Sequence, residues 1–164
     1  MRRTVTLPDS ARTADDSAQE AHFRALESLY SSAPVNALFE SGLEIIEAGR
    51  ARITFQAQKR YFHAAGATHG TLYFKMLDDA AFYAANSLVS DRFLLTTGFN
   101  LHFTKPLREG RVIAEGKWIS GKRRIFIAEA HLTDEDGDEI GRGTGTFMRS
   151  HIALSGIDGY RLRG

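Results

Sequence analysis

The chain has 164 residues, and 43% of them are apolar, which is enough for the core of one domain. Its 21 basic and 20 acidic side chains nearly balance, which argues against a generic nucleic-acid or membrane-surface protein. The chain has no cysteine, which excludes disulfides, thiol nucleophiles and cysteine–zinc sites.

Both ends of the chain are predicted to be tails around one domain at residues 17–150. Residues 1–16 are polar, charged and without periodicity, so we expect a disordered tail there, and we interpret 151–164 as a C-terminal tail. The first residues lack the apolar core of a signal peptide. The longest uncharged apolar run, 80–90, is too short to span a bilayer. We therefore expect a soluble, cytoplasmic protein with no membrane partner.

The first two predicted elements are a helix and a strand. Ser17 to Glu20 has the form of a capping box, and apolar residues follow at helical spacing, which predicts a helix over 17–32. One short turn is expected after Pro34. Apolar and polar residues then alternate, which indicates one half-buried strand within 43–58.

A long buried helix is predicted over 71–90, beginning near Gly70. Neither proline nor glycine interrupts it, and apolar residues occur on every side. A helix that is apolar all round is surrounded by protein. One or two of its aromatic side chains, or of those just before it, are expected to line a pocket. The candidates are Tyr61, Phe62, Tyr73, Phe74, Phe82 and Tyr83.

Four consecutive strands are predicted after this helix. Their two-residue periods fit 99–104, 111–120, 123–133 and 139–149. Hairpin turns join the second of these strands to the third and the third to the fourth. Gly141, Gly143 and Gly145 all fall on one face of the last strand, which allows another element to approach closely. The fold class is therefore α+β, with a curved antiparallel sheet that wraps the long helix.

Two adjacent acids, Asp78 and Asp79, stand out on a helix expected to be buried. Either acid could simply be paired, at a solvated gap or at a subunit interface. Alternatively, a buried carboxylate has a large desolvation cost and is retained for chemistry. Lys75 lies four residues before Asp79 and provides it with an ion-pair partner, whereas Asp78 has no such neighbour. Asp78 is therefore the more unusual acid.

The start of the long helix is a second candidate. Unpaired N–H groups near Gly70 could hold a developing oxyanion. Eight residues separate Gly70 from Asp78, which is about 12 Å along a helix, so one substrate carbonyl cannot easily touch both. If both serve one reaction, the acid must come from a second copy of the chain. A dimer with shared sites is thus a hypothesis from geometry.

Three stretches of the chain resemble the hotdog-fold acyl-CoA thioesterases of the phenylacetic-acid-degradation (PaaI-like) type. They are "GATHGTLYFKMLDDA", "TTGFNLHFTKPL" and "GRVIAEGKWISGKRRIFIAEAHLTDEDG", in the family's order, and the similarity covers about 34–149. The resemblance implies a long helix wrapped by a curved antiparallel sheet, assembled as homodimers and often as homotetramers. It therefore agrees with the fold expected from the periodicities.

The resemblance also implies four catalytic positions. Gly70 matches the residue whose N–H polarises the thioester carbonyl. Asp78 matches the carboxylate supplied by the partner subunit, acting as general base or as nucleophile. Thr96 matches a hydroxyl residue that places the water, and His63 matches a polar side chain that assists.

The chain departs from the family pattern at three positions. Thr71 replaces the second glycine of the motif, His63 stands where asparagine is usual, and Thr96 replaces serine. The Thr71 N–H remains, the imidazole of His63 would change charge with pH, and Thr96 keeps the hydroxyl. We interpret His69 as a residue that orients the loop beside the substrate.

A basic stretch between residues 104 and 124 holds seven basic and two acidic residues. It is either a solvated sheet face or a site for the phosphates of coenzyme A, for which Lys122 and Arg123 are the candidates. Six acids between residues 129 and 139 offset its charge, which argues against nucleic acid as a partner. No metal site is expected, because the histidines and Asp78 lack metal-binding spacing.

The sequence therefore predicts an enzyme that hydrolyses an acyl-CoA, with an aryl or a short- to medium-chain acyl group, to the free acid and coenzyme A. No cofactor is expected apart from the coenzyme A of the substrate. Two alternatives stay open: a hotdog module that binds acyl-CoA or a small ligand without turnover, and a hotdog hydratase or dehydratase. The latter would need a catalytic histidine, and only His63 could serve.

Overall fold

A computed structural model describes residues 9–162 as two helices and a six-stranded antiparallel sheet with order β1-β2-β4-β5-β6-β3. The helices and strands are α1 (Asp9–Ser32), β1 (Ser41–Glu47), β2 (Arg50–Ala57), α2 (Gly70–Asn86), β3 (Arg92–Phe103), β4 (Gly110–Ser120), β5 (Ile125–Thr133) and β6 (Glu139–Ala153). Three short 3-10 turns, η1 (Pro34–Leu38), η2 (Lys59–Tyr61) and η3 (Leu154–Gly156), lie between or after them. This arrangement confirms the predicted α+β hotdog fold.

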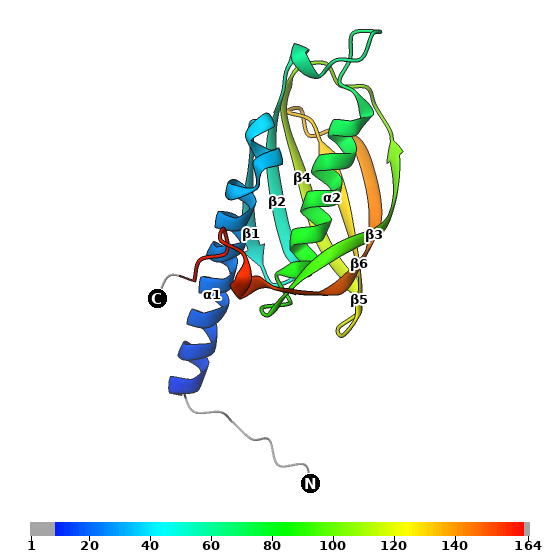
Figure 1. The fold of residues 1–164 in the computed structure, drawn as a ribbon. Helices are drawn as coiled ribbons and strands as arrows, with labels where there is room; N and C mark the ends of the chain where they lie inside the picture. Colours follow the sequence, from blue (N-terminus) through cyan, green and yellow to red (C-terminus); the bar gives the residue numbers. More distant parts are fainter. Residues whose placement is uncertain (1–8, 163–164) are drawn as a thin grey trace.

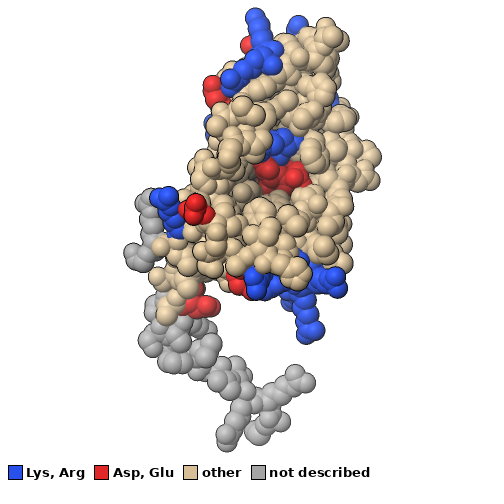
Figure 2. All heavy atoms as spheres, in the orientation of Figure 1, with Lys and Arg blue, Asp and Glu red and all other residues tan. Residues whose placement is uncertain are grey.

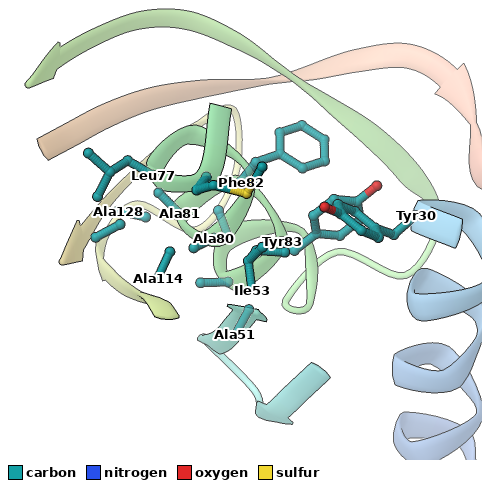
Figure 3. Packing of buried hydrophobic residues seen from close by; sticks show 14 of the residues in the cluster. Tyr30, Ala51, Ile53, Leu77, Ala80, Ala81, Phe82, Tyr83, Ala114 and Ala128 are labelled. Carbon is teal, nitrogen blue, oxygen red and sulfur yellow. The ribbon is translucent and has the colours of Figure 1, made fainter. Parts of the chain in front are cut away.

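The sheet curves around α2, and α1 lies along its β1 edge (Figure 1). Small residues make the close approach of helix and sheet possible. A Cβ atom on Gly116 would lie 2.0 Å from the Ala80 carbonyl oxygen, so only glycine fits there. Ala114 and Ala128 of the sheet face Ala80 and Ala81 of the helix (Figure 3), and all four are fully buried.

The core extends from the sheet through α2 to α1. Ile53 and Leu77 are fully buried within it. Tyr30 of α1 and Tyr83 of α2 meet edge to face, with ring centroids 5.5 Å apart, and their side chains point toward one another in Figure 3. Such aromatic pairs attach α1 firmly to the central helix.

The predicted strand at 43–58 is wrong in one respect, because this segment forms a hairpin of two strands, β1 and β2. The chain reverses at Gly49, whose φ of 83° is readily adopted only by glycine. The polar and apolar residues alternate on both sides of this turn, so the alternation alone does not reveal the reversal.

The predicted tails also need correction. The first helix begins at Asp9, so residues 9–16 are helical, while residues 1–8 of the expected tail lie outside the described residues. At the other end, β6 continues to Ala153, and Tyr160 is buried beside His22, with 2.6 Å between its hydroxyl and His22 Nδ1. Much of the expected C-terminal tail is therefore part of the domain.

The two edges of the sheet differ. At β1, side chains of α1 bind the strand's main chain: the Ile45 N–H donates to Glu27 Oε1 at 2.8 Å, and Arg24 donates to the Ile45 carbonyl at 3.2 Å. At β3, among the described residues, no hydrogen bond from outside β6 reaches the main chain of 95–103.

No helix in the described part of the chain is long and apolar enough to cross a membrane.

Candidate active site

The start of α2 is capped by the side chain of His69. His69 Nδ1 accepts a hydrogen bond from the Thr71 N–H at 3.1 Å and lies 2.7 Å from Thr71 Oγ1. Because Nδ1 accepts, the ring proton lies on Nε2. The Thr71 N–H is therefore occupied, whereas the Gly70 N–H has no hydrogen-bond partner among the described residues. Gly70 is thus the donor at this helix end that is free to bind an oxygen atom.

A pocket of about 370 Å³ opens in front of Gly70. His63, Tyr73 and Lys105 contribute to its walls, and Phe103 closes one side. A Cβ atom on Gly70 would lie 2.9 Å from Phe103 Cζ, so a larger residue there would have to displace this ring. Phe103 was not predicted as a site residue; its exposed fraction of 59% is a signal that appears only in the structure.

His63 is exposed in the loop before α2. Its Nδ1 accepts a hydrogen bond from the Ala65 N–H at 3.1 Å, which leaves Nε2 as the ring donor, and His63 lines the pocket. Arg108 contacts the same loop, since its Nε donates to the Gly66 carbonyl at 3.1 Å. Arg108 is a basic residue near the pocket that the sequence analysis did not single out.

Asp78 lies two turns further along α2, and its carboxylate faces β3. Thr96 Oγ1 donates to Asp78 Oδ1 at 3.0 Å. Burial raises the pKa of Asp78 to about 6, and the charge of Asp79 adds to this, while Thr96 and Lys75 oppose it. At neutral pH Asp78 is therefore mostly ionised, yet it is a stronger base than an ordinary aspartate.

Asp79 is paired, as its spacing from Lys75 predicts. Lys75 Nζ binds Asp79 Oδ2, and their side chains are 16% and 18% exposed. Asp78 has no cation bonded to it among the described residues. Figure 2 shows acidic and basic groups side by side in a hollow near the centre of the face turned to the viewer. The two neighbouring acids therefore have different environments.

One chain holds the predicted site residues in separate places. His63, Gly70 and Thr71 lie at the start of α2, and Asp78 with Thr96 lies about 12 Å further along the helix. Lys122 and Arg123 are exposed in the turn after β4, at the opposite end of the sheet from Gly70 (Figure 1). Among the described residues, no cluster of three acidic or histidine side chains could hold a metal ion.

Comparison with known proteins identifies the fold. A sequence model described as the thioesterase superfamily matches residues 65–140, which include Gly70, Asp78 and Thr96. This match covers less than half of the chain. A curated protein of Saccharolobus solfataricus, named provisionally as an esterase, is 26% identical over 105 residues, which is 64% of this chain and 70% of that protein.

Two solved structures share this fold over most of the chain. The PaaI protein from the phenylacetic acid degradation operon of E. coli superposes with a TM-score of 0.76 at 14% identity, covering 83% of this chain and 98% of that one. A thioesterase family protein from Silicibacter pomeroyi gives a TM-score of 0.72 at 23% identity, over 78% and 97% of the two chains. At these identities the likeness is one of fold.

Proposed function

We propose that this protein is an acyl-CoA thioesterase, a hydrolase that converts an acyl-CoA to the free acid and coenzyme A. The observation that carries the proposal is the Asp78–Thr96 pair, a carboxylate with a raised pKa held by a neutral hydroxyl on the wall of a thioesterase fold. The match to the thioesterase superfamily and the provisional esterase name of the relative support a hydrolase. An aryl or short- to medium-chain acyl group suits the aromatic side chains near Gly70.

The proposed active enzyme is a homodimer in which Gly70 of one chain faces Asp78 of the other. Three observations support this: Gly70 and Asp78 are too far apart for one carbonyl, the β3 edge is open, and residues 93–103 contain no Asp, Glu, Lys or Arg. A long edge strand without charged residues readily pairs with another strand. A tetramer formed from two such dimers is compatible with the same sites.

In the proposed mechanism Gly70 and Asp78 act on different atoms of the reaction. The Gly70 N–H binds the thioester carbonyl oxygen and stabilises the oxyanion as it forms. Asp78 takes a proton from water, the hydroxide oxygen attacks the carbonyl carbon, and the carbon–sulfur bond then breaks. The proton leaves with the coenzyme A thiol. The raised pKa makes Asp78 a stronger base for this step.

The remaining predicted residues assist in this scheme. Thr96 orients Asp78 and the water, and His63 donates from the pocket wall near the carbonyl. Lys122 and Arg123 can reach the thioester only from a neighbouring subunit, so we propose that the coenzyme A phosphates lie across a subunit boundary. Arg108 is the nearer basic residue within one chain.

The first test is thiol release from a panel of acyl-CoAs by wild type and Asp78→Asn. We expect a loss of about 10²- to 10⁴-fold in kcat for the variant, since the general base is removed. A thiol-reactive dye has no background, because the chain lacks cysteine. The wild-type rate should decrease as the pH is lowered below about 6, because Asp78 then becomes protonated.

The matched control is Asp136→Asn, an exposed acid in the turn between β5 and β6. This variant should keep the wild-type rate. Full activity of a folded Asp78→Asn protein, or no cleavage of any acyl-CoA by wild type, contradicts the proposed function. Binding without turnover would instead favour a ligand-binding module.

A further inference from the structure

An ion pair beside Asp78 has no part in the steps proposed above. Lys75 lies three residues before Asp78 and four before Asp79, and both spacings make side chains neighbours on a helix surface. The single ammonium group therefore has two carboxylates within reach. In the structure it binds Asp79, and Asp78 is left with Thr96 alone.

Contacts from the α1 side hold the ammonium near Asp79. Lys75 Nζ donates to Asn36 Oδ1 of η1 at 2.7 Å. It also lies 5.4 Å from the centre of the Tyr30 ring and 5.6 Å from that of the Phe39 ring, which are distances for cation–π attraction. Thr96 approaches Asp78 from β3 instead. Asp79 is thus bonded on the side of α2 that faces η1, and Asp78 on the side that faces β3.

We propose that Asp79 is a positioning residue, which holds the Lys75 ammonium away from Asp78 and so leaves Asp78 free to take a proton from water. This inference rests on the proposed function. If Asp79 were absent, Lys75 could turn to Asp78, form an ion pair there and stabilise its ionised form. Asp78 would then be a weaker base, and one of its oxygen atoms would be blocked.

The charges around Asp78 fit this arrangement. Burial is the largest influence on Asp78 and raises its pKa to about 6, while the charge of Asp79 raises this pKa and the charge of Lys75 lowers it. Tyr30 of α1 and Tyr83 of α2 remain neutral, since burial raises the pKa of both. From β3, Thr96 contributes an uncharged hydroxyl. No other charged group influences Asp78 within the described part of the chain.

Three variants test the inference: Asp79→Asn, Lys75→Met and the double variant. Carboxyl ¹³C NMR titration reports the pKa of Asp78, and the acid limb of the kcat/KM–pH profile reports it in turnover. Asp79→Asn should lower the pKa of Asp78 by about one unit and reduce kcat roughly tenfold. Lys75→Met should raise the pKa, because Asp79 is then an unpaired negative neighbour. The double variant should return near the wild-type pKa.

A structural role alone would not produce opposite shifts that cancel in the double variant. Shifts in the same direction, or no shift, overturn the inference. If a single variant fails to fold, Asp79→Glu decides: a wild-type titration of Asp78 supports the inference, and a titration lowered below that of wild type overturns it. The NMR titration does not depend on turnover. If the wild type cleaves no acyl-CoA, the proposed function is contradicted, and the titration of Asp78 in the three variants still tests the role of Asp79.

Discussion

The two edges of the sheet differ in how their main-chain groups are bonded. The β1 edge is closed by α1, whose Glu27 and Arg24 side chains bind the main chain of Ile45. The β3 edge is open among the described residues, contains no Asp, Glu, Lys or Arg over 93–103, and carries Thr96 beside Asp78. An edge whose main chain is bonded within the chain supports folding, whereas an open edge strand is suited to pairing with a second subunit.

Among substitutions at the two edges, the largest effect is expected from a charge placed on β3. A Cβ atom added at Gly98 of β3 or at Gly42 of β1 would meet no atom within 4 Å, so either position accepts a side chain without an internal clash. Gly98→Asp should prevent dimer formation and reduce kcat/KM by about 100-fold or more, because like charges face each other across paired strands.

Gly42→Asp is the matched control and should keep both the dimer and the activity. Light scattering gives the molar mass, and thiol release gives the rate. A Gly98→Asp protein that is dimeric and fully active would contradict the proposal that β3 forms the dimer interface. Equal damage from both substitutions would do the same.

A smaller effect is expected within the β3 edge itself. Thr96→Val removes the hydroxyl that binds Asp78 and should reduce kcat roughly tenfold, since one hydrogen bond that orients the base is lost. Thr97→Val removes the neighbouring hydroxyl, which donates to the Thr146 carbonyl, and should leave kcat within about twofold. Steady-state kinetics of the two variants check this, and equal losses would contradict the role of Thr96.

The smallest effect is expected at the closed edge. Glu27→Ala leaves the Ile45 N–H without its partner and should lower the free energy of unfolding by about 1–2 kcal/mol, with little change in kcat. Glu20→Ala, at an exposed ion pair with Arg24, should change it by less than about 0.5 kcal/mol. Urea unfolding of both variants measures the difference. A large loss of activity in Glu27→Ala would show that α1 also serves the site.

Periodicity predicted the parts of the fold where one pattern persists. The apolar helix α2 and the alternating strands β4 to β6 were predicted in order, because their patterns are long and uninterrupted. The hairpin at Gly49 was missed because alternation continues on both sides of the turn. The helix over 9–16 was missed because its residues are polar and carry no apolar stripe.

The site was predictable only where its residues are close in sequence. The spacing of Lys75 and Asp79 on one helix was enough to distinguish Asp79 from Asp78. Thr96 lies 18 residues from Asp78, so only the family resemblance pointed to it, and the fold brings the two side chains together. Phe103 was missed because its position over Gly70 depends on how β3 passes the start of α2.

The most direct measurement of the shared site uses mixed dimers. Asp78→Asn and Gly70→Val are each expected to be inactive alone, since they remove the base and block the oxygen site. Unfolded and refolded together in equal amounts, they should recover about a quarter of wild-type activity, because half the dimers are mixed and each has one intact site. No recovery, although mixed dimers form, would place Gly70 and Asp78 in the same site of one chain and contradict the account.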